Sequence, residues 1–180
     1  MAVKHQRSRT ERPPLDEQGL EQAALGYAGR YATSRARLAA YLRRKLRERG
    51  WSGGGDPRVD LLVERMAALG YVDDRAFASA RADSLGRRGY GERRVREALR
   101  AAGIAEEDSA EAREAARGRA WQAALRFAER RAIGPFAAAP PDRKGREKAL
   151  GALLRAGHPP DLARRLASAS PGEVPDADDV

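Results

Sequence analysis

The sequence predicts an all-α protein made of three tandem three-helix repeats, helix-turn-helix-like units that stack into an elongated, curved body. Three observations predict this fold. Apolar residues recur at spacings of three and four along most of the chain, and no segment alternates for long as a strand would. Glycines stand where helices are expected to end. A helical segment that closes on a glycine returns at intervals of 53 and 54 residues, which indicates repetition.

The first repeat, residues 15–70, contains three stretches of helical periodicity. Ser34 is a candidate N-cap of the second helix, and Gly50 and Gly70 are candidate ends of the second and third helices. The segment GWSGGGDP, residues 50–57, is expected to be a flexible joint. The apolar positions are Leu20, Ala24, Tyr27 and Tyr31 in the first helix, Leu38, Leu42 and Leu46 in the second, and Leu62, Met66 and Leu69 in the third.

The second repeat, residues 71–115, is punctuated by caps and glycines. Asp73 stands where a helix N-cap belongs, with Asp74 in the positive first turn. Gly89 is expected to end that helix, Gly91 to let the backbone enter the next one, and Gly103 to close it.

The third repeat, residues 116–168, follows the same scheme. Trp121, Leu125 and Ala128 share one helical face, IGPFAAAPPDR at 133–143 forms a proline-containing joint, and Gly157 ends a helix.

The strongest sign of repetition lies in three aligned helix ends. The segments LRRKLRERG, VREALRAAG and ALGALLRAG end at Gly50, Gly103 and Gly157, and each has a leucine four residues before its glycine: Leu46, Leu99 and Leu153. Units of this size bury little surface alone and gain stability by stacking on their neighbours.

Composition limits the classes of function. Basic residues number 35 against 26 acidic ones, a net charge of +9 that suggests polyanions or acidic protein surfaces as partners. Arginine dominates the basic residues, a bias that a GC-rich genome would also produce. There is no cysteine, which excludes disulfides and thiolate sites and fits a cytoplasmic location. Residues 1–14 are expected to be a disordered basic arm without a secretory signal, and residues 169–180 a disordered acidic tail. No apolar run is long enough to span a membrane.

The glycine cluster at 86–91 raises the possibility of a phosphate-binding loop. A P-loop needs Lys and Ser or Thr directly after its glycines and a strand before them, and this segment has neither. The interpretation as a turn between two helices is therefore favoured. Asp73 and Asp74 lack converging partners, because His5 lies in the basic arm and His158 in the third repeat. We expect no catalytic residues, no cofactor and no metal site.

Two clusters of arginine lie on equivalent helices of the first and second repeats. A run of charge is often only a solvated helix face, but stacking of these repeats would align the two clusters as one basic stripe, suited to nucleic acid or to a partner wrapped around it. Tyr90, between the helices of the second repeat, is expected either to contact a partner or to pack against its turn. The arginines proposed to form the basic stripe are Arg43, Arg44, Arg87, Arg88, Arg93, Arg94 and Arg96.

The segment LGYVDDRAFASARADSLGRRGYGERRVREALRAAGI, residues 69–104, resembles the signature of the RecX family of regulatory proteins. The family pattern runs from a Gly-Tyr-hydrophobic-Asp-Asp element to a Gly-Tyr-Gly turn and a helix that ends in Leu-x-x-x-Gly-Ile. Its resemblance is strong in the second repeat, fair in the first and weak in the third. The matching residues are Gly70, Tyr71, Val72, Asp73, Asp74, Phe77, Gly89, Tyr90, Gly91, Leu99, Gly103 and Ile104.

The resemblance implies a regulator rather than an enzyme. RecX proteins bind RecA recombinase, lodge in the groove of the RecA–DNA filament and restrain its ATPase, strand-exchange and coprotease activities. We therefore expect RecA and the RecA–DNA filament as partners, direct contact with DNA as a further possibility, no membrane association and a monomeric chain. The alternative is a stand-alone helical nucleic-acid-binding protein or helix-turn-helix regulator, which would bind a specific duplex site and form a dimer.

Overall fold

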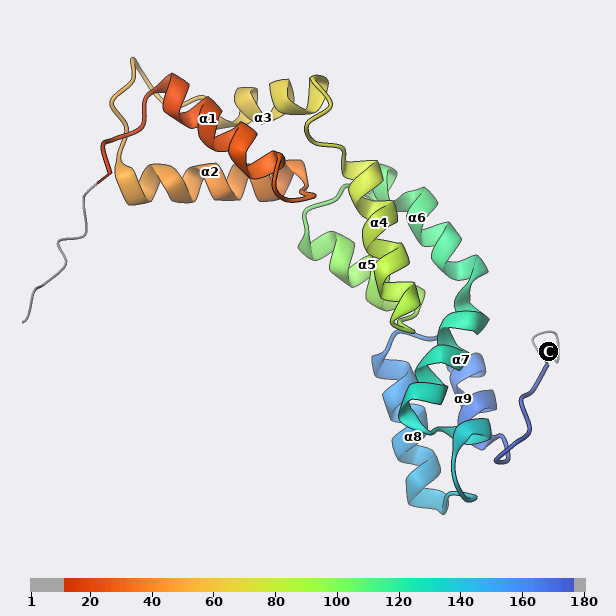
Figure 1. Ribbon diagram of the computed structural model, residues 1–180. Coiled ribbons are helices and arrows are strands. Elements are labelled where there is room, and N and C mark those ends of the chain that lie inside the picture. The colour runs from red at the N-terminus through yellow and green to blue at the C-terminus, as the bar shows by residue number, and fades with distance from the viewer. Residues whose placement is uncertain (1–11, 177–180) are drawn as a thin grey trace, which may run out of the picture. The chain divides into compact units, whose positions relative to one another are not determined.

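The chain is all-helical over residues 12–176, the part that the computed structural model describes (Figure 1). The all-α prediction is confirmed, and the helices are consistent with tandem helical repeats. The chain divides into two compact units, of which the first ends at Asp73 and the second begins at Asp74. The first unit contains α1 (Glu17–Ala28), α2 (Arg35–Arg49) and α3 (Val59–Ala68). The second contains α4 (Asp74–Arg87), α5 (Glu92–Ala101), α6 (Glu106–Gly118), α7 (Ala120–Arg131), the 3-10 helix η1 (Gly134–Phe136), α8 (Arg143–Arg155) and α9 (Pro160–Ser168).

The first unit is a three-helix bundle around one apolar core. Leu38, Leu42 and Met66 are completely buried, as expected for residues at helical spacing on α2 and α3. Ser34 caps α2 as predicted, because its hydroxyl accepts a hydrogen bond from the Arg37 N–H at 3.3 Å. The segment before α1 joins this core, since Leu15 is buried and its N–H donates to the Gly50 carbonyl at 3.1 Å.

The second unit contains two apolar cores. One gathers α4, α5 and α6 around Phe77 and Leu99, and the other gathers α7, α8 and α9 around Phe127 and Leu153. Tyr90 packs against both cores. The 3-10 helix lies against α7 and α9. We call α1–α3, α4–α6 and α7–α9 the first, second and third helix trios. The second and third helix trios are thus joined within one compact unit.

Glycines end the helices as predicted. Gly70, Gly89, Gly103 and Gly157 all have positive φ values, from 71° to 93°. After each one, the next N–H donates to a carbonyl in the last turn of the preceding helix, for instance Ile104 to Leu99 at 3.1 Å. This is the Schellman arrangement, in which a left-handed residue satisfies carbonyls that would otherwise lack partners.

The repeat boundaries and the termini stay predictions. The boundary predicted between residues 115 and 116 falls inside α6, which runs to Gly118 and is followed almost directly by α7. Residues 1–11 of the predicted basic arm and 177–180 of the predicted acidic tail lie outside the described residues. Within residues 169–176, the Gly172 N–H donates to the Pro135 carbonyl at 2.8 Å. No helix in the described part of the chain combines the length and the apolar character that crossing a membrane requires.

Candidate partner-binding surface

The turn between α4 and α5 presents two arginines beside a half-buried tyrosine. Arg87 ends α4, and both Arg87 and Arg88 are exposed. The Arg88 guanidinium lies 5.4 Å from the centre of the Tyr90 ring, within the range of a cation–π contact. The Tyr90 ring lies 6.5 Å from that of Phe127. Tyr90 therefore packs against the turn and the third helix trio, which leaves Arg87 and Arg88 as the more accessible side chains.

Gly89 and Gly91 have different physical roles in this turn. Gly89 has a φ of +73°, and a Cβ atom there would lie 2.7 Å from the Phe127 backbone nitrogen. Gly91 has an ordinary φ of −81°, so it is not required for a left-handed conformation. A Cβ atom on Gly91 would instead overlap the Gly157 carbonyl. Gly91 stands at the start of α5, as predicted, and glycine is needed there because two backbones meet.

Backbone hydrogen bonds hold this junction between the second and third helix trios. The Gly91 N–H donates to the Ala156 carbonyl at 3.0 Å, and the Arg93 N–H donates to the Gly157 carbonyl at 3.3 Å. Gly91 at the start of α5 and Gly157 at the end of α8 therefore lie where these two elements dock against each other. This contact fixes the direction in which α5 presents its first arginines.

His158 lies beneath the same junction. It is 3% exposed, its Nε2 lies 3.0 Å from the Gly89 carbonyl oxygen, and its ring meets Phe127 edge-on at 5.8 Å. Burial lowers the pKa of His158, because the charged imidazolium would lose its hydration, and the hydrogen bond to Gly89 opposes this effect. A neutral ring with a proton on Nε2 fits this position. His158 therefore packs within this junction.

The arginines of α5 differ in their partners. Arg93 donates to the Leu154 carbonyl at the end of α8 and lies 3.8 Å from a Glu97 carboxylate oxygen. Arg94 reaches the other oxygen of the same carboxylate at 3.3 Å. Both side chains are about half exposed, so solvent and salt screen these ion pairs and they are weak. Arg96 is half-buried. Arg93 thus helps to hold α5 against the end of α8, while Arg94 faces solvent.

The two arginines proposed on α2 belong to the first unit. Arg43 pairs with Asp60 of α3 at 2.6 Å, and Arg44 pairs with Glu48 at 3.6 Å. Both pairs are exposed, so solvent screens them. Since the other five arginines belong to the second unit, their union into one basic stripe stays a prediction.

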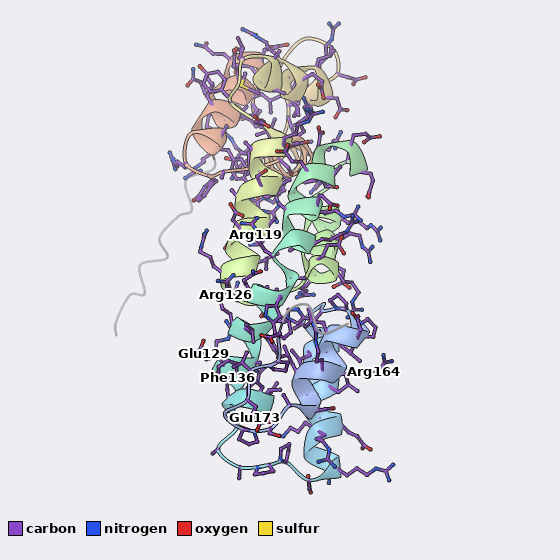
Figure 2. The ribbon with its side chains drawn as sticks, turned by 90° about the vertical axis from the view of Figure 1, so that its right-hand side faces the viewer. Arg119, Arg126, Glu129, Phe136, Arg164 and Glu173 are labelled. Carbon is purple, nitrogen blue, oxygen red and sulfur yellow. The ribbon has the colours of Figure 1, made fainter. Side chains whose placement is uncertain are left out.

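A second arginine cluster, which sequence reasoning missed, lies beside Arg87. Arg87, Arg119 and Arg126 line a cavity of about 140 Å³ together with Tyr90 and Asp83. Arg119 is bound to Asp83 at 2.7 Å. Figure 2 shows Arg119 and Arg126 on the same side of the second unit. The spacing of seven residues between these two positions is two helical turns, a signal that could have placed them on one face.

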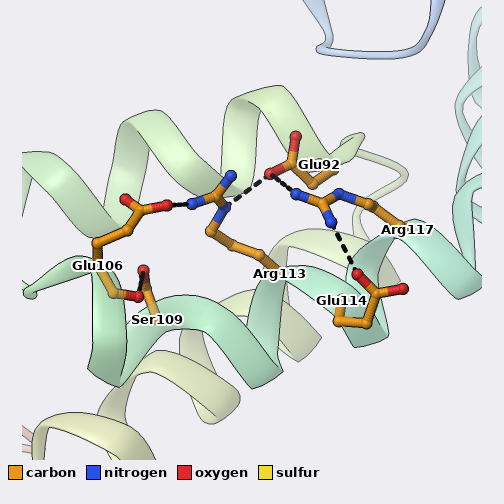
Figure 3. A network of polar contacts seen from close by, with 6 residues as sticks. All are labelled: Glu92, Glu106, Ser109, Arg113, Glu114 and Arg117. Atoms are coloured by element: carbon orange, nitrogen blue, oxygen red, sulfur yellow. Dashed lines mark hydrogen bonds and ion pairs between the residues drawn. The ribbon is translucent and has the colours of Figure 1, made fainter.

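An ion-pair network around the buried Arg113 side chain holds α5 against α6 (Figure 3). Arg113 of α6 is 9% exposed and donates from Nε to Glu92 at 2.8 Å, and its Nη1 meets Glu106. Arg117 lies 3.9 Å from the same Glu92 oxygen and 2.7 Å from Glu114. Glu92 stands in the first turn of α5, where the helix dipole also favours a carboxylate. Charged residues of α6 therefore help orient α5, a role that helical periodicity did not reveal.

The remaining motif residues are structural in this geometry. Asp74 is buried in the first turn of α4, directly after Asp73, while Phe77 and Leu99 lie in the same core. Gly70 and Gly103 have left-handed conformations at helix ends, and Tyr71 is 52% exposed. Among residues 12–176, no group of three or more His, Asp or Glu side chains has an arrangement that could hold a metal ion.

Comparison with known proteins agrees with the resemblance to the RecX family seen in the sequence. A family model described as the second three-helix domain of RecX matches residues 73–112, which include the glycine turn between α4 and α5. The chain is 31% identical over 160 residues to a protein of Myxococcus xanthus named regulatory protein RecX, an alignment that covers 84% of this chain and 86% of that relative. It is 39% identical over 84 residues to a protein of the same name from Thermus thermophilus, covering 47% of this chain and 56% of the relative.

Proposed function

Since the chain belongs to the RecX family of regulatory proteins, we propose that it binds RecA recombinase and the RecA–DNA filament. In this proposal, binding reduces the ATPase, strand-exchange and coprotease activities of RecA. The protein acts as a cytoplasmic monomer, carries out no turnover of its own and needs no cofactor. DNA within the filament is a second contact.

The observation that carries the proposal is the exposed arginine cluster at the α4–α5 turn. Arg87 and Arg88 are exposed at the end of α4, and Arg94 is half exposed at the start of α5. Their backbones are fixed by the glycine junction, so the loss of conformational entropy on binding is limited to the side chains. Arginine pairs well with carboxylate and phosphate, the anionic groups that a protein–DNA filament displays.

The test is a titration of preformed RecA filaments on single-stranded DNA while ATP hydrolysis is followed. We choose Arg87→Gln, Arg88→Gln and Arg94→Gln together, and we leave Arg93 intact because it bonds to the Leu154 carbonyl. Three lost charge pairs, at about 0.5–1 kcal/mol each, are expected to raise the half-inhibitory concentration at least about tenfold.

The matched control removes three charges from another helix of the same unit. Arg143, Lys144 and Lys148 are exposed on α8, and their combined change to Gln lowers the net charge equally. The control is expected to inhibit much as the unaltered protein does. Equal inhibition by both triple variants would show that net charge, and not the α4–α5 turn, accounts for binding. A specific duplex site found in the absence of RecA would instead support the stand-alone regulator.

A further inference from the structure

The first unit contains a groove in which aromatic and basic side chains alternate. The groove has a volume of about 450 Å³ and lies between α1 and α2. It is separate from the α4–α5 turn, because every residue that lines it belongs to the first unit. Its aromatic and basic members are Tyr27, Arg30, Tyr31, Tyr41, Arg44 and Lys45, which we call the tyrosine groove.

The rings of Tyr31 and Tyr41 both contact that of Tyr27, and the three rings are not equally exposed to solvent. Tyr27 and Tyr41 stack at 4.1 Å with an interplanar angle of 16°, so each covers a face of the other. Tyr31 is tilted by 50° against Tyr27 at 5.4 Å. Tyr31 is 58% exposed, whereas Tyr27 and Tyr41 are half-buried. A large part of the Tyr31 ring therefore remains accessible beside a stack already in place, an arrangement that another flat ring can extend.

The charged residues of the tyrosine groove are all basic. The guanidinium of Arg44 lies 5.6 Å and the ammonium of Lys45 lies 5.8 Å from the centre of the Tyr41 ring. Glu48, outside the lining, pairs with both of them, at 3.6 Å and 2.9 Å. Arg30, which precedes Tyr31 in the sequence, also lines the groove and is exposed. The single negative charge of Glu48 thus balances only one of the three positive charges of Arg30, Arg44 and Lys45. The groove therefore keeps a net positive charge.

From this combination, we propose that the tyrosine groove binds single-stranded nucleic acid, with a base stacked on Tyr31 and backbone phosphates at Arg30 and Arg44. Unpaired strands expose the faces of their bases next to a charged backbone, and proteins bind them with aromatic rings in a basic groove. Duplex bases are already stacked on one another and offer no free face. The inference goes beyond the proposed function, in which DNA is a second contact, because it names a groove and a stacked base, and it is argued without RecA.

The experiment is fluorescence anisotropy of a short labelled oligodeoxythymidine titrated with the full chain in the absence of RecA. Tyr31→Ala is expected to weaken binding at least about fivefold, the lower end of what one base–aromatic stack contributes. Tyr31→Phe keeps the ring and is expected to bind nearly as the unaltered chain does. Tyr71→Ala is the matched control, because Tyr71 is a similarly exposed tyrosine of the same unit that does not line the groove.

Salt dependence separates the phosphate contact from the stacking contact. Arg30→Gln is expected to reduce the slope of log affinity against log salt by about 0.7, the value for one phosphate contact on a single strand. Tyr31→Ala is expected to leave that slope unchanged. Arg47→Gln, which removes an exposed arginine of α2 outside the groove, provides the control for net charge.

Three outcomes would overturn the inference. The first is equal oligonucleotide affinity for Tyr31→Ala and Tyr71→Ala. The second is a loss with Tyr31→Phe as large as with Tyr31→Ala, because the ring would then not be the binding element. The third is a Tyr31→Ala variant that binds the oligonucleotide with unchanged affinity but binds DNA-free RecA more weakly. That result would make the groove a protein-docking surface. None of these outcomes bears on the arginines of the α4–α5 turn, so the two proposals fail separately.

Discussion

Single glycines determine how the second unit presents its arginines. Gly89 allows a left-handed turn, while Gly91 and Gly157 allow two backbones to touch. The close contact matters because α5 begins at this point, with Arg93 bound to the end of α8 and Arg94 facing solvent. The direction of the proposed binding surface therefore depends on the lack of a Cβ atom at Gly89, Gly91 and Gly157.

Gly91→Ala is expected to destabilise the second unit by about 2 kcal/mol or more, because the new methyl group meets the Gly157 backbone and neither element can move freely. Gly86→Ala is the control: a Cβ atom there meets nothing within 4 Å, and alanine in the last turn of α4 is expected to stabilise by at most about 0.5–1 kcal/mol. Urea unfolding followed by Trp121 fluorescence in a Trp51→Phe background measures both. Similar stabilities for the two variants would contradict the close-approach argument.

His158 is expected to make the second unit sensitive to mild acid. Its pKa is lowered in the folded chain, so the unfolded chain binds the proton more readily and stability rises with pH. The contribution of the neutral ring is complete above pH ~6.5, its unfolded pKa, and is lost as pH falls toward the folded value. The unfolding free energy is expected to decrease as pH falls below about 6.5, by at most about 1.4 kcal/mol per pH unit.

His158→Gln keeps a hydrogen-bond donor but does not titrate, so its unfolding free energy is expected to change less over the same interval. The other histidine of the sequence is His5, outside the described residues. An identical pH profile for both proteins, measured by urea unfolding, would show that His158 is not the responsible group.

At the scale of elements, helix ends were predicted well and helix contacts were not. Ser34, Gly70, Gly89, Gly103 and Gly157 act as caps because capping depends on residues within one turn. The place of Gly91 at the start of α5 was predicted, but its contact with Gly157 was missed, since Gly157 lies far along the chain and no local pattern marks a backbone contact. The burial of Arg113 was also missed, because a charged residue on a polar helix has the signature of a solvated face.

The Arg113 network is expected to contribute strongly to the packing of α5 against α6. Arg113→Met leaves Glu92 with only 16% of its side chain exposed and without its closest partner, at an expected cost of about 2–4 kcal/mol. Arg143→Met, which breaks the exposed Arg143–Glu147 pair, is expected to cost less than about 1 kcal/mol. Trp121-monitored urea unfolding checks both changes. A smaller loss for Arg113→Met than for Arg143→Met would contradict the assigned role of the network.

At the scale of the whole molecule, the repeat spacing predicted the order of the helix trios correctly in outline. Three aligned glycines 53 and 54 residues apart correspond to the ends of α2, α5 and α8. The contacts that join the second and third trios include the one between Gly91 and Gly157 and the packing of Tyr90 against both cores, which spacing does not encode. The candidate surface was predictable as a set of charged positions, whereas the partners of Arg93 and Arg113 depend on tertiary packing.

The central claim, that this chain binds the RecA–DNA filament, has one direct measurement. RecA is assembled on single-stranded DNA with a non-hydrolysable ATP analogue, the chain is added, and the filaments are sedimented. We predict that the chain sediments with the filaments in a saturable manner, and that much less sediments with DNA alone at the same salt concentration. A chain that stays in the supernatant with filaments, or that sediments equally with DNA alone, would contradict the account.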